Sequence, residues 1–326
     1  MLYVGVDEAG YGPRLGPLCV AATCFRLDVS REASARVVAP VLWELLKPAV
    51  GRSGASQRES GGGIIVGDSK RVLARGPHGL GEGLVRLGRA LLAFSLAGGH
   101  EWRDDEEFLR VLGARSGPET WYGGAAIACG SYELGRCDAN HLREACARAG
   151  VGMESIRARV LAEHEYNERC AATGNKARVS FSLVGELLRE CWERLGPGDR
   201  GFFAVDRQGG RARYREVLEK ELPGVEVRAV DESPASSVYE LVDGTGRRAT
   251  LMFEVGGEER HLPVALASMT AKYLRERMMQ RFNRYWCARI PELKPTAGYE
   301  VDARRWLEDV RAHVSAEELR GLIRVL

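Results

Sequence analysis

The feature that most constrains this chain is an apolar run that ends in two adjacent acids and a glycine-rich turn. Residues 2–6 (LYVGV) have the composition of a buried strand, and Asp7 and Glu8 follow at once, before Gly10 and Gly12. Neighbouring acids on a strand are poor core material, because a buried carboxylate needs a cation or a metal as its partner. Two interpretations are open on these residues alone: a solvated junction between strand and loop, or a metal-assisted reaction on a phosphate substrate.

The composition is that of an ordinary globular protein. The 326 residues are 45% hydrophobic and 28% charged with a net charge of +2, so any basic patch must be local. No apolar run reaches the roughly 18 residues of a membrane span, and the chain starts in a strand rather than in a signal core. The eight cysteines form no C-x-x-C pair, which favours buried free thiols. We therefore expect a cytoplasmic protein without membrane contact.

A second apolar run repeats the pattern of the first. Residues 201–206 (GFFAVD) end in Asp206, and two such strands side by side would bring Asp7, Glu8 and Asp206 to one edge of a sheet. Glu258, just before a long predicted helix, is a fourth candidate. Carboxylates are the ligands that Mg²⁺ or Mn²⁺ prefers, and two ions about 4 Å apart would activate a water and stabilise the leaving oxygen of a phosphodiester. Taken singly, each acid also fits a solvated surface position.

The rest of the chain predicts an α/β fold, because predicted strands are followed by helices. Strands are predicted at 18–25, 64–66, 225–230 and 248–254, and helices at 80–97, 139–149, 177–194, 211–221, 263–284, 302–312 and 315–325. Residues 98–175 are the hardest to interpret. We take them as an insertion or small subdomain of unknown role between residues 1–97 and 176–326, which form one larger domain.

Five motifs, in order along the chain, resemble those of the type 2 ribonucleases H, ribonucleases HII and HIII. They are Asp7-Glu8-Ala9-Gly10 with Gly12-Pro13, Asp68-Ser69-Lys70, Asp206 at a strand end, Ala267-Ser268-Met269-Thr270-Ala271-Lys272, and Gly298-Tyr299. The first two lie within residues 1–73 and the others within 178–312. Residues 98–175 contain no counterpart of these motifs.

The resemblance implies a ribonuclease H-like fold, with a mixed five-stranded sheet flanked by helices, in the larger domain. It also implies an endoribonuclease that hydrolyses the RNA strand of RNA–DNA hybrids, or cuts at ribonucleotides embedded in duplex DNA, leaving 3′-hydroxyl and 5′-phosphate ends. Two ions of Mg²⁺ or Mn²⁺ would be held during catalysis by Asp7, Glu8, Asp206 and Glu258. Glu259 is the alternative fourth ligand, because the register there is anchored only by short motifs.

The same motifs imply a set of substrate contacts. By position these are Gly10, Tyr11, Gly12, Ser69, Lys70, Ser268, Lys272 and Tyr299. Lys70 would meet a phosphate as a point charge, and Ser268 and Lys272 share one helix face. Without the motifs, Lys70 is an ordinary surface lysine, and Lys272, Arg275 and Arg277 form a solvated stripe. Tyr299 would stack on a sugar or, without the motif, pack at the surface.

Tyr11 departs from the family pattern, in which Arg, Lys or Thr usually stands between the two glycines and the flanking backbone contacts the ribose 2′-hydroxyl. Gly10 and Gly12 preserve the close backbone approach, but a cation is lost. Tyr11 either stacks on a base or ribose or packs as an aromatic residue at a turn. His261 either donates a hydrogen bond toward the scissile region or caps the start of the long helix.

Two other functions stay open on the sequence. Tyr11 and residues 98–175 motivate a structure-selective DNA nuclease or resolvase on the same fold. A non-cleaving module that binds hybrids is the other alternative, although unused acids packed together would be electrostatically costly. The sequence leaves the oligomeric state open.

Overall fold

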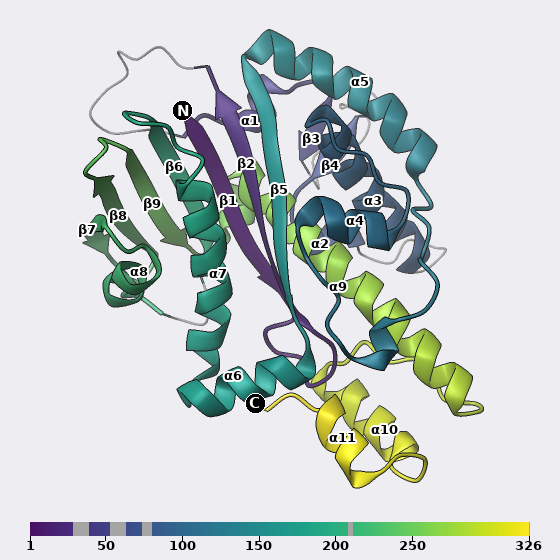
Figure 1. The fold of residues 1–326 in the computed structure, drawn as a ribbon. Coiled ribbons are helices and arrows are strands. Elements are labelled where there is room, and N and C mark those ends of the chain that lie inside the picture. The colour runs from purple at the N-terminus through teal and green to yellow at the C-terminus, as the bar shows by residue number, and fades with distance from the viewer. Residues whose placement is uncertain (29–38, 53–62, 74–79, 208–210, 326) are drawn as a thin grey trace.

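The computed structural model of the chain describes residues 1–28, 39–52, 63–73, 80–207 and 211–325. Its centre is a seven-stranded mixed sheet in the order β5-β2-β1-β6-β9-β8-β7, with helices on both faces (Figure 1). Strands β3 and β4 form a separate parallel pair. The predicted α/β class with a mixed, helix-flanked sheet is confirmed, but the sheet has seven strands where the resemblance implied five.

The elements have the following bounds. The strands are β1 (Leu2–Ala9), β2 (Leu18–Leu27), β3 (Val50–Arg52), β4 (Ile64–Val66), β5 (Val151–Leu161), β6 (Arg200–Asp206), β7 (Val225–Glu232), β8 (Ser236–Asp243) and β9 (Arg248–Glu254). The helices are α1 (Leu42–Leu45), α2 (Ser69–Leu73), α3 (Leu80–Ala97), α4 (Asp105–Leu112), η1 (Thr120–Tyr122), α5 (Tyr132–Ala149), α6 (Glu163–Thr173), α7 (Lys176–Trp192), α8 (Arg215–Glu221), η2 (Gly257–Glu259), α9 (Leu262–Arg289), α10 (Glu300–Val310) and α11 (Ala316–Leu322).

Three parallel strands form the middle of the central sheet. Strand β6 lies between β1 and β9 and runs parallel to both, whereas β2 pairs antiparallel with β1. Strands β1 and β6 are apolar almost throughout because helices cover both of their faces. The carboxyl ends of β1, β6 and β9 therefore meet at one edge of the sheet, and this edge positions the site.

Two strands of the sheet have no counterpart in the sequence prediction. Strand β5 pairs with β2, and β8 lies between β9 and β7. Both interleave charged residues with apolar ones and so lack a continuous apolar run; on β5, for example, Arg157 and Arg159 bind the carboxylate of Glu190 on α7. Because β5 belongs to residues 98–175, part of that segment completes the central sheet. The division of the chain at residues 97 and 176 stays a prediction.

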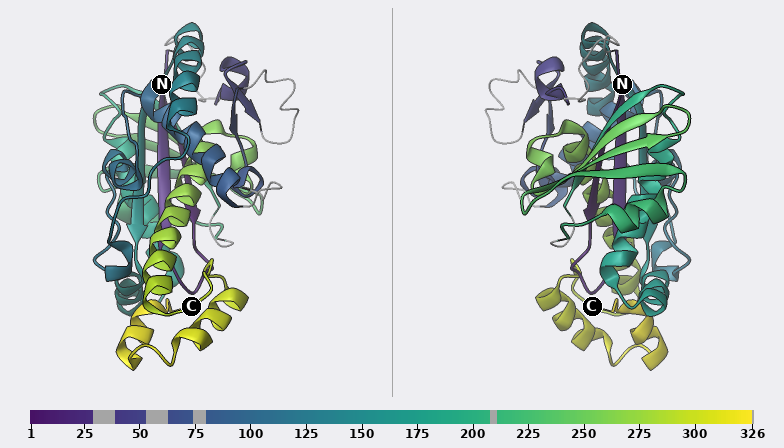
Figure 2. Two further views of the ribbon diagram at one scale, coloured as in Figure 1. Left: turned by 90° about the vertical axis from the view of Figure 1, so that its right-hand side faces the viewer. Right: turned by 90° about the vertical axis from the view of Figure 1, so that its left-hand side faces the viewer.

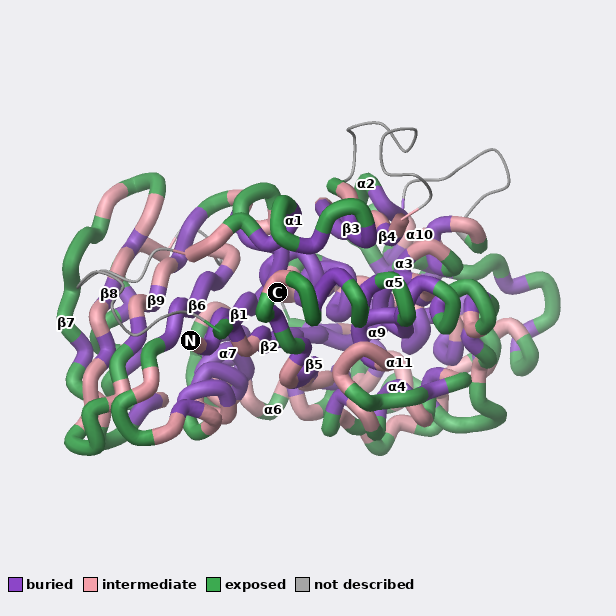
Figure 3. The backbone as a smooth tube through the Cα atoms, turned by 90° about the horizontal axis from the view of Figure 1, so that it is seen from above, coloured by how far each residue is buried: buried purple, intermediate pink, exposed green. Residues whose placement is uncertain are grey.

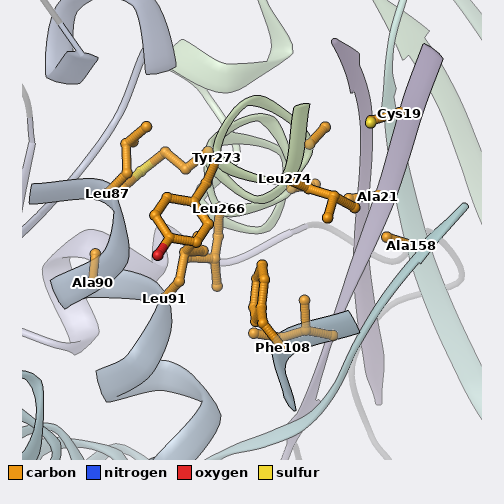
Figure 4. Close-up of a cluster of buried hydrophobic side chains, with 14 of the residues drawn as sticks. Cys19, Ala21, Leu87, Ala90, Leu91, Phe108, Ala158, Leu266, Tyr273 and Leu274 are labelled. Carbon is orange, nitrogen blue, oxygen red and sulfur yellow. The ribbon is translucent and has the colours of Figure 1, made fainter. Parts of the chain in front are cut away.

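Two apolar cores lie on the two faces of the sheet. The larger packs the sheet against α9, α3, α4 and α5; Figure 4 shows Leu266, Tyr273 and Leu274 of α9 between Leu87 of α3 and Ala21 of β2. The smaller packs the other face against α6, α7 and α8. The views in Figure 2 show α9 on one side of the sheet, and Figure 3 shows that burial is deepest at the central strands and weakest at the edge strand β7.

The long helix α9 bears out its prediction most closely. It begins at Leu262, with a proline in its first turn, and ends at Arg289, five residues beyond the predicted end. Across the described ranges of the chain, no helix is both long and apolar enough to cross a lipid bilayer. All eight cysteines are free, and six of them are buried.

Candidate functional site

Two carboxylates lie side by side where β1 and β6 end. The strands are parallel with Val6 opposite Val205, so the next residues, Asp7 and Asp206, are neighbours at the sheet edge. Asp7 is buried and Asp206 is half-buried. The sequence prediction rested on this convergence of two residues that are far apart in the chain, and the structure brings them together.

Burial and like charge act together on these acids. Burial, followed by the charges of Asp206 and Glu8, raises the pKa of Asp7 well above its usual range. Burial, followed by the charge of Glu258, raises the pKa of Asp206 to about 6, although the backbone N–H of Gly257 donates a hydrogen bond of 3.0 Å to its carboxylate. Crowded carboxylates of this kind are stabilised by a cation placed among them.

The short turn η2 carries both candidates for the fourth acid, and their side chains have different surroundings. Glu258 is half-buried and lies close enough to Asp206 that, after burial, its charge is the main cause of the raised pKa of Asp206. The side chain of Glu259 is 62% exposed and faces the guanidinium of Arg71 at 3.7 Å. The structure therefore places Glu258 beside the strand-end acids, while Glu259 points to the surface.

The residue types at this edge suit hard divalent cations. Asp7, Glu8, Asp206 and Glu258 supply only carboxylate oxygens, the donors that Mg²⁺ and Mn²⁺ prefer. Among the residues that the structure describes, no three His, Cys, Asp or Glu side chains already stand in a chelating arrangement. The donor chemistry thus fits a divalent ion, and the mutual repulsion of these acids gives the ion a favourable electrostatic environment.

Two serines extend the acidic centre toward α2. The hydroxyls of Ser268 and Ser69 are 3.1 Å apart and buried, and Ser268 is also hydrogen-bonded to the carboxylate of Asp7. Lys70 follows in the first turn of α2 and is exposed, and its backbone N–H donates to Asp68. The motifs around Ser69 and Ser268, nearly 200 residues apart, therefore meet at Asp7.

Lys272 and Tyr299 lie next to each other, one on α9 and one before α10. The ammonium of Lys272 is 5.9 Å from the ring centre of Tyr299 and forms an ion pair of 2.8 Å with Glu276. Tyr299 is 46% exposed, which leaves its ring free to contact a ligand. The solvated stripe that the sequence left open is wrong, because Arg275 and Arg277 are buried.

The glycine-rich turn after β1 has the conformation that its glycines allow. Gly10 has a φ of 93°, and a Cβ there would lie 2.5 Å from the carbonyl oxygen of Pro17. Gly12 is exposed, whereas Tyr11 is half-buried at the rim of the smaller core. The ammonium of Lys176 lies 5.5 Å from the Tyr11 ring. Much of the Tyr11 ring is therefore covered by packing at the turn, the second of the two roles that the sequence left open.

A polar network behind the acids was not anticipated from the sequence. His261 neither caps α9 through its side chain nor points to open solvent; its Nδ1 is 2.5 Å from the Tyr3 hydroxyl and its Nε2 is 2.6 Å from Glu254. Glu254 also binds Arg260 at 2.7 Å, and charge and hydrogen bonds from His261 and Arg260 outweigh burial and lower its pKa. The apolar–acid pattern of residues 248–254 was the only signal for this network.

Comparisons with known proteins give only a weak structural likeness. No protein-family model and no curated protein match the chain. Similar solved structures include ribonuclease HII of Archaeoglobus fulgidus in a complex with PCNA (18% identity, TM-score 0.41, covering 100% of this chain and 94% of that one) and ribonuclease H2 of Pyrococcus horikoshii (14%, TM-score 0.42, 99% and 92%). Bst ribonuclease HIII in complex with Mn²⁺ is another (16%, TM-score 0.42, 99% and 66%).

These identities and TM-scores are too low to transfer a role to any residue. The assignment of residues therefore depends on the geometry of this chain alone.

Proposed function

We propose that this protein is a metal-dependent endoribonuclease of the type 2 ribonuclease H class. Its substrate would be the RNA strand of an RNA–DNA hybrid, or a ribonucleotide embedded in duplex DNA. The observation that carries the proposal is the meeting of Asp7, Asp206 and Glu258, from two strand ends and a turn, in a cluster where burial and then like charge raise the carboxyl pKa values of both aspartates.

The four acids would hold two ions of Mg²⁺ or Mn²⁺. When bound, such ions activate a water for attack on phosphorus and stabilise the leaving oxygen, which gives 3′-hydroxyl and 5′-phosphate ends. The protein's part is to fix the donors. Strand pairing sets Asp7 beside Asp206, and the Gly257 N–H orients the Asp206 carboxylate from the turn that carries Glu258.

The surroundings of the acids supply candidate contacts for a nucleic-acid backbone. The Ser268 hydroxyl lies beside Asp7 and is hydrogen-bonded to Ser69, and the exposed Lys70 follows Ser69 in the first turn of α2. On the other side, Lys272 supports the exposed ring of Tyr299, which suits stacking on a sugar. These contacts bind a backbone without reading base sequence.

The test is cleavage of end-labelled duplexes that contain one, four or only ribonucleotides in one strand, with Mg²⁺ and Mn²⁺ compared. We expect cuts at the ribonucleotides that leave 3′-hydroxyl and 5′-phosphate ends. Preference for an all-DNA branched duplex would instead favour a structure-selective nuclease. Hybrid binding without turnover in either metal would favour a non-cleaving module.

A further inference from the structure

A buried arginine near the end of the described chain lies directly beneath the glycine-rich turn. Arg324 follows α11 and is 2% exposed. One terminal nitrogen donates to the carbonyl of Gly10 at 2.5 Å and to that of Gly16 at 3.4 Å, and the other donates to the carbonyl of Tyr11 at 3.3 Å. Figure 1 shows the C-terminus beside α6 and the loop that leaves β1.

The Arg324 guanidinium donates to carbonyls of the β1–β2 loop and contacts Tyr166 on α6. Within the described part of the chain no carboxylate forms an ion pair with its guanidinium, which instead stacks 4.0 Å from the ring centre of Tyr166 on α6. Burying a cation without an acidic partner is costly unless other groups solvate it. Here the carbonyls of the turn do so, which ties the position of Arg324 to the conformation of Gly10 and Tyr11.

The hydrogen bonds to Arg324 also fix the directions of the backbone N–H groups on the opposite face of the turn. In a trans peptide unit the C=O and the following N–H point in opposite directions. Because the Gly10 and Tyr11 carbonyls point to Arg324, the N–H groups of Tyr11 and Gly12 point away from it. Neither N–H has an acceptor among the described residues. Two free donors above a buried positive charge form a site for a substrate oxygen.

The side chain of Asn167 on α6 binds the backbone on both sides of Arg324. The amide of Asn167 donates to the carbonyl of Ile323 and accepts from the N–H of Val325, both at 2.8 Å. The N–H of Arg324 itself donates to the carbonyl of Arg14, inside the β1–β2 loop. Asn167 therefore sets the depth at which the guanidinium enters beneath the turn.

We infer that Arg324 is a positioning residue: it orients the Gly10–Tyr11–Gly12 turn so that two backbone N–H groups bind an oxygen of the nucleic-acid backbone beside Asp7. The inference rests on the proposed function for the identity of that oxygen. The absence of a cationic side chain at position 11 is then compensated, because the charge of Arg324 lies beneath the turn. The segment after α11 and helix α6 thereby act on substrate affinity from behind the site.

The test compares Arg324→Lys and Asn167→Ala with the control Arg281→Lys, which alters another buried arginine away from the turn. Lysine keeps the charge but has no planar fork to reach both carbonyls. We expect KM for a ribonucleotide-containing duplex to rise about tenfold in both test variants, with kcat changed less than about threefold. Hydrogen exchange of residues 9–17 should accelerate in both, and in neither measurement should the control change.

Unchanged KM in folded Arg324→Lys would overturn the inference, as would equal increases of KM in the control. If the wild-type protein cleaves no ribonucleotide-containing duplex, the proposed function fails instead. Hydrogen exchange separates the two failures: slow, wild-type exchange of residues 9–17 in both test variants shows that Arg324 does not order the turn, whatever the substrate is.

Discussion

Individual carboxylates in this protein sit where burial and neighbouring charge oppose their ionisation. Asp7 and Asp206 face other acids, so their raised pKa values reflect repulsion as well as burial. Glu163 is different: burial raises its pKa to about 7, while it accepts hydrogen bonds from the Gly16 N–H and the Tyr122 hydroxyl. Removing charge therefore has different consequences at the two kinds of position.

Asp7→Asn should lower cleavage by roughly a hundredfold or more and leave the melting temperature equal to or above that of the wild type. The substitution removes a potential metal ligand but also relieves repulsion from Asp206 and Glu8. Thermal unfolding at neutral pH, measured beside cleavage of a ribonucleotide-containing duplex, tests this. Cleavage by the variant at the wild-type rate would show that Asp7 is not part of the catalytic site.

The raised pKa of Glu163 should make the free energy of unfolding depend on pH. Its folded pKa of about 7 exceeds the unfolded value, so its favourable contribution is complete below about pH 4.5 and is lost as the pH rises through 7. We expect the wild type to lose about 3 kcal/mol of unfolding free energy from this group between pH 4.5 and 8, and Glu163→Gln to lose less over that range. Denaturant unfolding at both pH values measures the difference; parallel pH profiles would contradict it.

At the scale of elements, helix α9 and strand β1 are the pair that fixes the acids. The two are in contact where Gly5 passes Pro263, and the hydroxyl of Thr23 on β2 donates to the Pro263 carbonyl at 2.7 Å. A Cβ on Gly5 would lie 2.1 Å from the Pro263 backbone. The absence of a side chain there lets α9 bring Ser268 to Asp7.

Gly5→Ala should therefore destabilise the protein by about 1–3 kcal/mol or more, because backbone atoms of α9 must shift. Gly244→Ala is the matched control, since a Cβ there meets nothing within 4 Å. Urea unfolding of both variants is the measurement. Equal unfolding free energies for the two variants would show that α9 does not pack on β1 as described.

The elements also show what the sequence could predict. Strands β1 and β6 were predictable because each is a continuous apolar run, and helix α9 because it is a long segment of helix formers that starts at a proline. The two strands placed Asp7 and Asp206 together. Strands β5 and β8 were not, because charges interrupt their apolar pattern. Arg324 was not either, since it binds backbone carbonyls, which leave no trace in the sequence near Gly10.

At the scale of the whole molecule, residues 98–175 are joined to the rest by buried polar contacts as well as by β5. Arg281 on α9 binds Asp105 on α4 with both side chains buried, and Glu163 on α6 links Tyr122 to the β1–β2 loop. The segment without recognisable motifs thus supports the strand that carries Asp7 and the helix that carries Ser268.

Asp105→Ala should cost about 3–5 kcal/mol of unfolding free energy, because it removes the only buried carboxylate among the described ion-pair partners of the Arg281 cation. Glu106→Ala removes an acid 3.2 Å from the same guanidinium but at an exposed position, so it should cost no more than about 1 kcal/mol. Chemical denaturation of both variants tests the difference. A similar small loss in both would make the α4–α9 contact peripheral.

We propose that carboxylates from distant parts of the chain form one metal-binding centre, and a comparison of Glu258 with Glu259 tests this. Mn²⁺ binding, followed by electron paramagnetic resonance during titration, should weaken roughly tenfold or more in Glu258→Gln and stay at the wild-type level in Glu259→Gln, whose side chain faces Arg71. Wild-type Mn²⁺ affinity in Glu258→Gln, or a loss confined to Glu259→Gln, would show that Glu258 does not belong to a metal-binding centre with Asp7 and Asp206.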